Sequence, residues 1–202
     1  MPRTLVFAQQ KGGAGKTTLL VQLAHAFAAR GRAVRLLDLD PQGTLARWAA
    51  IRDDPRLPCT AAPDWQASSA LRRAAEGAEL LLVDLPGSAD ILQRAALRAA
   101  SLVLVPAQPT PPDAWATAPT LAAAAKERAP ARVVLNRVPA RGASPAALAA
   151  LGDAALLSAT LGARVAFADA FAEGRAAAEL APRSRAAAEV RALADEVGGL
   201  LR

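Results

Sequence analysis

A glycine-rich loop between an apolar strand and a helix constrains the fold of this 202-residue chain more than any other feature. Residues 4–8 form a short apolar run that predicts a buried strand, and residues 17–30 follow the pattern of a helix. The loop between them closes with Gly-Lys-Thr at residues 15–17, as the phosphate-binding pattern G-x-x-x-x-G-K-[ST] does, but it opens on Lys11 where glycine is usual. A strand, a glycine loop and a helix in this order predict a nucleotide site on a parallel α/β sheet.

The residues of the loop suit phosphate chemistry. Glycines let backbone N–H groups approach phosphate oxygens, and the thin stem of Lys16 can bring its ammonium to the β- and γ-phosphates. Thr17 offers a hydroxyl to Mg²⁺ and begins a helix whose dipole favours the phosphates. The residues that we expect to bind the nucleotide here are Gly12, Gly13, Ala14, Gly15, Lys16, Thr17 and Thr18.

Three carboxylates follow predicted strands and should meet at the same edge of the sheet. Asp84 ends the apolar run 79–84, in the manner of a Walker B acid that holds Mg²⁺ through water. Asp38 and Asp40 end the run 33–38. One of these two could orient the attacking water and the other could support magnesium.

Strands alternate with helices along the whole chain, which predicts a doubly wound α/β fold: a mainly parallel sheet with helices on both faces. We expect one P-loop ATPase domain over residues 1–202. Pro119 should limit or kink the helix in which it lies. Beyond the first strand and helix, predicted strands cover 33–38, 57–61, 79–84, 101–106, 132–136 and 154–159, and predicted helices cover 44–52, 66–76, 109–128, 144–151, 165–173 and 184–197.

Composition excludes several classes of protein. Cys59 is the single cysteine, so no disulfide can form within the chain and a cysteine metal cluster is excluded. No apolar run reaches transmembrane length and the chain enters its first strand at once, so we expect no signal peptide, no membrane association and a cytoplasmic protein. The net charge of +6 permits nucleic-acid binding, although a basic soluble surface explains it too.

Several motifs together resemble the deviant Walker ATPases of the ParA/MinD family. They are residues 11–18, 38–43, 80–87, 106–115, 135–137, 164–167 and 179–187, and residues 44–48 resemble the short ParA-type partition proteins in particular. The resemblance implies that Lys11 reaches across a homodimer to the partner's ATP. It also implies that Asp40 positions the hydrolytic water, while Asp38 and Asp84 support the metal.

Further roles follow from the same resemblance. Asn136 matches the residue that reads adenine, Pro109 should line the base, and Gly87 should be the hinge of a loop that senses the γ-phosphate. A DNA-facing patch could include Arg183 and Arg185, with contributions from Arg137, Arg141, Arg164 or Arg175, although an ordinary solvated helix face is an equal alternative. We expect Trp48, Trp65 and Trp115 to be packing residues.

The implied function is an ATPase switch with ATP and Mg²⁺ as cofactors. ATP would drive dimerisation, and the dimer would coat nucleoid DNA without sequence preference. A ParB-like or cargo adaptor would stimulate hydrolysis, and the cargo could be a plasmid, a chromosome or a protein assembly. The absence of an N-terminal operator-binding region argues against sequence-specific repression.

Two other classes are weighed against this function. A MinD-like membrane regulator needs an amphipathic C-terminal anchor, whereas residues 194–202 are short and interrupted by glycines. An ATP-dependent metabolic synthetase needs a substrate pocket that the sequence does not locate.

Overall fold

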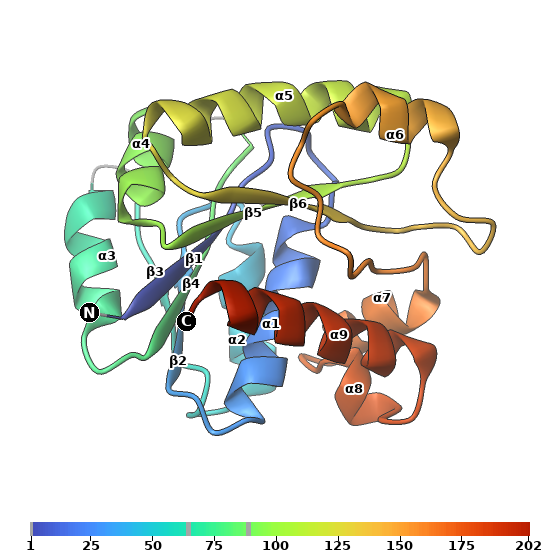
Figure 1. Cartoon of the computed structure of the whole chain (residues 1–202). Coiled ribbons are helices and arrows are strands. Elements are labelled where there is room, and N and C mark those ends of the chain that lie inside the picture. The colour runs from blue at the N-terminus through green and yellow to red at the C-terminus, as the bar shows by residue number, and fades with distance from the viewer. Residues whose placement is uncertain (1, 64–65, 88–89) are drawn as a thin grey trace.

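A computed structural model of the chain describes residues 2–63, 66–87 and 90–202, and a parallel sheet forms its centre (Figure 1). Strands follow one another in the spatial order β3-β2-β4-β1-β5-β6, and every pairing between them is parallel. The order reverses at β1, which lies between β4 and β5. The strands are β1 (Arg3–Phe7), β2 (Val34–Asp38), β3 (Cys59–Ala61), β4 (Leu80–Asp84), β5 (Leu102–Ala107) and β6 (Ala131–Leu135).

Helices cover both faces of this sheet. One face carries α1 (Lys16–Ala28), α2 (Thr44–Arg52), α7 (Val165–Ala172), α8 (Ala177–Leu180) and α9 (Arg185–Leu200). The other carries α3 (Ala67–Ala75), α4 (Asp90–Ala99), α5 (Pro111–Lys126) and α6 (Pro145–Leu151). The predicted α/β class and its two helical layers are therefore confirmed.

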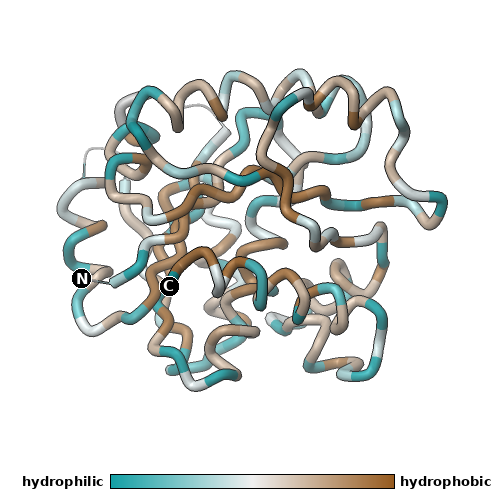
Figure 2. The backbone as a smooth tube through the Cα atoms, viewed as in Figure 1, coloured by the Kyte–Doolittle hydropathy of each residue, from teal (hydrophilic) through white to brown (hydrophobic). Residues whose placement is uncertain are grey.

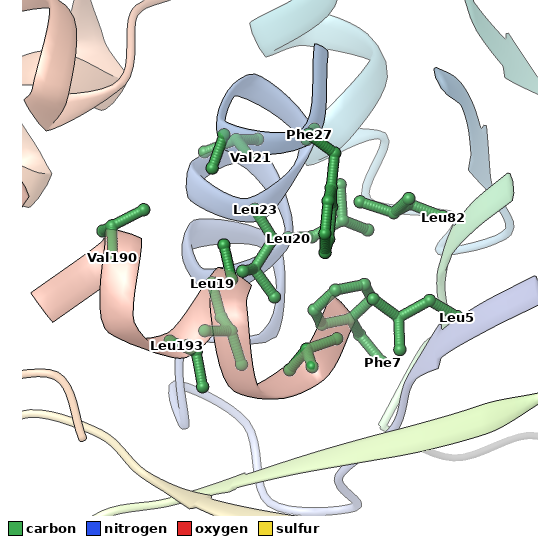
Figure 3. Packing of buried hydrophobic residues seen from close by; sticks show 14 of the residues in the cluster. Leu5, Phe7, Leu19, Leu20, Val21, Leu23, Phe27, Leu82, Val190 and Leu193 are labelled. Carbon is green, nitrogen blue, oxygen red and sulfur yellow. The ribbon is translucent and has the colours of Figure 1, made fainter. Parts of the chain in front are cut away.

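Alternation along the strands builds two cores, one on each face. In β1, Leu5 and Phe7 pack under α1, whereas Val6 between them packs on the opposite side. Figure 3 shows the first core, in which leucines of α1 meet Leu82 of β4 and Leu193 of α9. The strands are the most hydrophobic part of the backbone trace, and the connecting turns are largely hydrophilic (Figure 2).

Hydroxyl side chains begin three of the helices. Thr110, Ser144 and Ser184 each accept a hydrogen bond from the backbone N–H three residues later, and α5, α6 and α9 start directly after them. α5 continues through Pro119 to Lys126, so the expected interruption does not end the helix. α4 and α8 were not predicted, and α8 spans only four residues, Ala177–Leu180.

The predicted strand at residues 154–159 is wrong. This segment touches β6 through a single bridge between Leu156 and Val133, and a second bridge joins Gly162 to Val138. The ladder stops because the carboxylate of Glu196 on α9 accepts the N–H groups of Ser158 and Ala159. A side chain thus replaces the neighbouring strand as the hydrogen-bond partner of this backbone.

Candidate functional site

A cavity of about 630 Å³ opens at the carboxyl ends of the strands, above the glycine loop. Parallel sheets bind ligands at this edge, where the strand order reverses. Many of the residues predicted to bind nucleotide line the cavity, together with residues from the loops after β2 and β4. The lining comprises Gln10, Gly12, Gly13, Gly15, Lys16, Thr17, Thr18, Asp40, Pro41, Gln42, Thr44, Pro86, Gly87, Arg137 and Phe171.

The backbone of the loop needs its glycines. Gly13 and Gly15 have φ angles of 75° and 92°, which residues with a Cβ rarely adopt. A Cβ on Gly15 would also lie 2.3 Å from Nδ2 of Asn136. Gly87 also lies close to the start of the loop, because a Cβ there would lie 2.8 Å from the carbonyl oxygen of Gln10. Movement of Gly87 would therefore be felt directly by the phosphate loop.

Lys16, Thr17 and Asp84 form the centre of the site. Lys16 is buried at the first turn of α1, and the hydroxyl of Thr17 donates to Oδ2 of Asp84 at 2.5 Å. The other oxygen of Asp84, Oδ1, is buried and has no hydrogen-bond partner among the described residues. Burial raises the pKa of Asp84 to about 7, and the bond from Thr17 opposes that rise.

These groups fit a magnesium ion that is bound together with phosphates. Mg²⁺ prefers oxygen ligands and is commonly held by one or two carboxylates plus substrate phosphates. Thr17 and the free oxygen of Asp84 supply such oxygens beside the loop. In the described residues no group of three or more His, Cys, Asp or Glu side chains could hold an ion. Phosphate oxygens would complete the ligand set.

Asp38 and Asp40 have separate structural positions. Both oxygens of Asp38 accept backbone N–H groups, from Asp40 at 3.0 Å and from Ala46 at 2.8 Å, so this carboxylate fixes the loop that leads into α2. Burial raises its pKa. Asp40 accepts the N–H of Gln42 and lines the cavity, so it is the acid of this pair that faces the cavity.

Lys11 does not line the cavity. Its ammonium lies 2.8 Å from Oδ2 of Asp113 at the start of α5, and its side chain is 39% exposed while that of Asp113 is 5% exposed. Thr110 donates to the same carboxylate oxygen. The lysine that opens the loop is therefore tied to α5 at the rim of the site.

The two residues expected at the base do not line the cavity described above. Asn136 is buried beneath the loop, donates to the carbonyl of Ala14 at 2.9 Å and accepts the N–H of Arg137. Pro109 is buried and does not line the cavity. Their role at the adenine stays a prediction, and in this structure the amide of Asn136 supports the phosphate loop.

Sequence reasoning missed two side chains of the cavity. Arg137 was considered for a DNA patch, but it lines the cavity with a φ of 54°, directly after Asn136. Phe171 reaches the cavity from α7, and the centroid of its ring lies 6.4 Å from that of Trp48. The positive φ of Arg137 cannot be read from sequence. Phe171 comes from a helix far along the chain, so only the fold brings it here.

Residues 5–177 match the family described as the CobQ/CobB/MinD/ParA nucleotide binding domain. The chain belongs to this family. The cavity above the glycine loop is the candidate nucleotide site of this chain.

Relatives in sequence support the ParA/MinD assignment. The chain is 30% identical over 207 residues to the maintenance of carboxysome distribution protein A of Halothiobacillus neapolitanus, covering 96% of this chain and 95% of that protein. It is 36% identical to the chromosome-partitioning ATPase Soj of Thermus thermophilus, over 52% of this chain and 55% of Soj.

Solved structures of the ParA/MinD family share the fold. The septum site-determining protein MinD of Pyrococcus horikoshii, complexed with Mg-ADP, superposes with a TM-score of 0.80 at 20% identity and covers 99% of this chain and 97% of that one. An ATP complex of McdA from Cyanothece gives 0.79 at 16% identity, over 99% and 96% of the two chains.

Outside the nucleotide site, the arginines predicted to face DNA divide into two groups in this ParA/MinD-family chain. Arg164 forms an ion pair with Glu189, and Nη1 of Arg175 lies 3.9 Å from Glu173. Arg183 and Arg185 are exposed. No helix in the described part of the chain has the length and apolarity needed to cross a membrane.

The tryptophans also divide. Trp48 is 1% exposed and packs as predicted, whereas Trp115 on α5 is 66% exposed, so its predicted packing role is wrong. Trp115 follows the buried Asp113 by two residues, and this places its indole on the outer side of the helix. Trp65 lies outside the described residues.

Proposed function

We propose that this chain is a single-domain ATPase that ATP and Mg²⁺ convert from a monomer into a homodimer, and that the dimer positions or partitions a cargo. Support comes from the family and from relatives whose names refer to carboxysome distribution and chromosome partitioning. The cargo belongs to the same broad class: a plasmid, a chromosome or a protein assembly.

The observation that carries this proposal is the different placement of the two loop lysines. Lys16 is buried at the phosphate site, so one subunit already supplies the cation that the phosphates need. Lys11 lies at the rim with 39% of its side chain exposed, where a second subunit can approach. A second ammonium that its own cavity does not use is suited to the nucleotide of a partner subunit.

The ion pair between Lys11 and Asp113 opposes the proposed dimerisation. To reach a partner's nucleotide, the ammonium of Lys11 must leave a carboxylate that is 5% exposed. Separating a partly buried ion pair leaves a desolvated charge behind, which opposes dimerisation until nucleotide phosphates replace the carboxylate. This competition favours slow basal turnover, and a ParB-like or cargo adaptor would stimulate hydrolysis.

Residues of the site divide the hydrolytic work. Asp40 faces the cavity and would orient the attacking water, while Lys16 would neutralise phosphate charge. Mg²⁺, when bound through Thr17 and Asp84, supplies further neutralisation of the phosphates. Asp38 holds the loop that carries Asp40 in place.

Dimerisation is tested by light scattering after size exclusion with Mg-ATP, in an Asp40→Ala background that slows hydrolysis. We expect a dimer, and we expect Lys11→Ala to remain monomeric while it still binds ATP. Lys126→Ala removes the exposed third lysine at the end of α5 and is the matched control, which should dimerise normally. Normal dimerisation by the Lys11→Ala protein would contradict the proposal.

DNA binding is tested separately on the same Asp40→Ala protein. Fluorescence anisotropy with duplexes of unrelated sequence should show binding that needs ATP and weakens steeply with salt. Replacement of both Arg183 and Arg185 by glutamine should reduce this binding, because both side chains are exposed. ATP-loaded dimer without DNA affinity at low salt would reject the nucleoid-associated part of the proposal.

A further inference from the structure

A second cavity lies at the opposite edge of the sheet, where the strands begin. It has a volume of about 360 Å³, at the small end of the range for ligand sites, and is enclosed by the end of α1, the start of β2, the Pro55–Pro58 segment and Gly77. Its charged lining residues are Arg32, Arg35 and Arg56, and no carboxylate among the described residues lines it. Both ends of the chain mark this edge in Figure 1.

Arg35 is the most informative of the three arginines. It lies in β2 and is half-buried, and its guanidinium makes no hydrogen bond or ion pair within the described residues. Its Nη2 lies within 3.5 Å of the position that a Cβ would take on Gly77, which has a φ of 70°. The guanidinium of Arg35 therefore lies beside Gly77, whose lack of a side chain leaves space on that side of the cavity.

The other two arginines each have a carboxylate partner, so among the described residues the uncompensated charge at the cavity is that of Arg35. Nε of Arg32 lies 3.3 Å from Glu79 Oε1 but is buried without a hydrogen bond in the described structure. Glu79 uses its second oxygen to accept the N–H of Ala33. Arg56 pairs with Asp54, but the same carboxylate also accepts from Arg52. Positive charge thus exceeds the carboxylates available around the cavity.

A neighbouring cavity extends the positive surface along this edge. It is lined by Arg3, Arg32 and Arg202, with Glu79 as the one acidic side chain among its described lining residues, and Arg3 donates to the terminal oxygen of Arg202. Arg32 and Gly77 belong to both cavities, so the two are contiguous. Adjacent sites for negative groups suit a ligand that carries more than one phosphate.

We propose that the cavity lined by Arg32, Arg35 and Arg56 is a phosphate-binding site separate from the nucleotide site. Guanidinium groups present planar forks of N–H donors that match phosphate oxygens, and the half-buried position of Arg35 strengthens its contact. The phosphate belongs either to the backbone of a nucleic acid or to a free phosphorylated molecule. Because this site lies on the single chain, it does not depend on dimerisation or hydrolysis.

The test uses pyrophosphate as the probe and protein saturated with Mg-ADP, which keeps the probe out of the phosphate loop. Calorimetry should show one pyrophosphate bound per chain. Arg35→Gln should weaken binding at least about tenfold, since it removes a cation but keeps a polar stem. Arg94→Gln, at an exposed arginine of α4, is the matched control and should bind within about twofold of the parent, because it touches neither cavity.

Arg56→Gln provides a second variant in case Arg35→Gln does not fold, because the Arg56 side chain is 69% exposed. It should also weaken pyrophosphate binding several-fold. A parent protein that binds no pyrophosphate, or folded variants at both positions that bind it as the parent does, would overturn the proposal.

A DNA arm then separates the two sources of phosphate. Anisotropy is measured against salt on the ATP-loaded Asp40→Ala protein with and without Arg35→Gln. A slope of log K against log salt that falls by about 0.9 per lost contact identifies nucleic acid as the ligand. An unchanged slope with weakened pyrophosphate binding identifies a free phosphorylated molecule. Both results support the site, and a protein that fails to bind DNA at all leaves the pyrophosphate result decisive.

Discussion

At the carboxyl edge of the sheet, charged side chains meet partners of opposite sign: Lys11 lies against Asp113, and the charge of Lys16 partly opposes the rise that burial causes in the pKa of Asp84. At the amino edge, Arg35 has no such partner within the described residues. A ligand that binds at the carboxyl edge must therefore break existing charge contacts, so its binding changes the arrangement of side chains there. A ligand that binds at the amino edge meets a guanidinium that is unpaired in the described part of the chain, and it needs no such rearrangement.

Lys16→Ala tests the carboxyl edge most severely. Removal of the buried ammonium should weaken binding of Mg-ATP at least about 100-fold, because burial strengthens its contact with phosphate and Arg137, the other cation of the described lining, comes from the loop after β6. Calorimetry measures the loss, with Lys126→Ala as the control. A loss below about tenfold would mean that Lys11 or Arg137 replaces Lys16 in the monomer.

Gly15→Ala tests whether this edge is built around backbone geometry. The new Cβ would lie 2.3 Å from Nδ2 of Asn136, and residue 15 would have to keep a φ of 92°. We therefore expect the free energy of unfolding to fall by about 2 kcal/mol and nucleotide binding to weaken. Urea unfolding measures the first effect. Gly31→Ala, near the amino edge, has a φ of 79° but nothing within 4 Å, so its loss should be smaller. Equal losses would mean that the contact with Asn136 is unimportant.

Asp84→Asn tests how the buried carboxyl group at the carboxyl edge makes the free energy of unfolding depend on pH. Burial raises the pKa of folded Asp84 to about 7, whereas an unfolded aspartate has a pKa of about 3.9. Between these values the folded state binds more protons, so its free energy of unfolding falls as pH rises from about 4 to 7. The asparagine variant lacks this contribution.

Urea unfolding without nucleotide should therefore show the stability of Asp84→Asn, relative to the parent, increasing across that pH range and levelling off above it. Loss of the hydrogen bond from Thr17 changes the stability of the variant by the same amount at each pH, so it does not affect the slope against pH. A relative stability that decreases with pH would show that the carboxylate is stabilised in its charged form instead.

Arg30→Ala should have the smallest effect. Arg30 pairs with Asp195 near the amino edge, but the two side chains are 35% and 72% exposed, so the pair should contribute no more than about 0.5 kcal/mol. Thermal unfolding at low and high salt measures it. A larger loss would show that charge pairs near this edge also support the fold, and the contrast between the two edges would be weaker.

Local sequence was a good guide where one segment contains its own explanation. The glycine loop predicts its strand, its helix and its phosphate chemistry, because all three lie within residues 3–28. Asp84 was also predictable, since it ends an apolar strand. Prediction failed where a distant group intervenes: Glu196 of α9 ends the pairing expected for residues 154–159, and burial of Asp113 leaves Trp115 exposed.

The sequence by itself determined the α/β class and the carboxyl-edge nucleotide site, because parallel strands bring their ends together whatever the details of packing. Tertiary structure alone decided which partner each charge has. Lys11 finds Asp113, Asn136 supports the carbonyl of Ala14, and Arg35 meets Arg32 and Arg56 around one cavity. These contacts join residues up to 122 positions apart, and electrostatic interactions depend on distance and burial, neither of which a linear sequence contains.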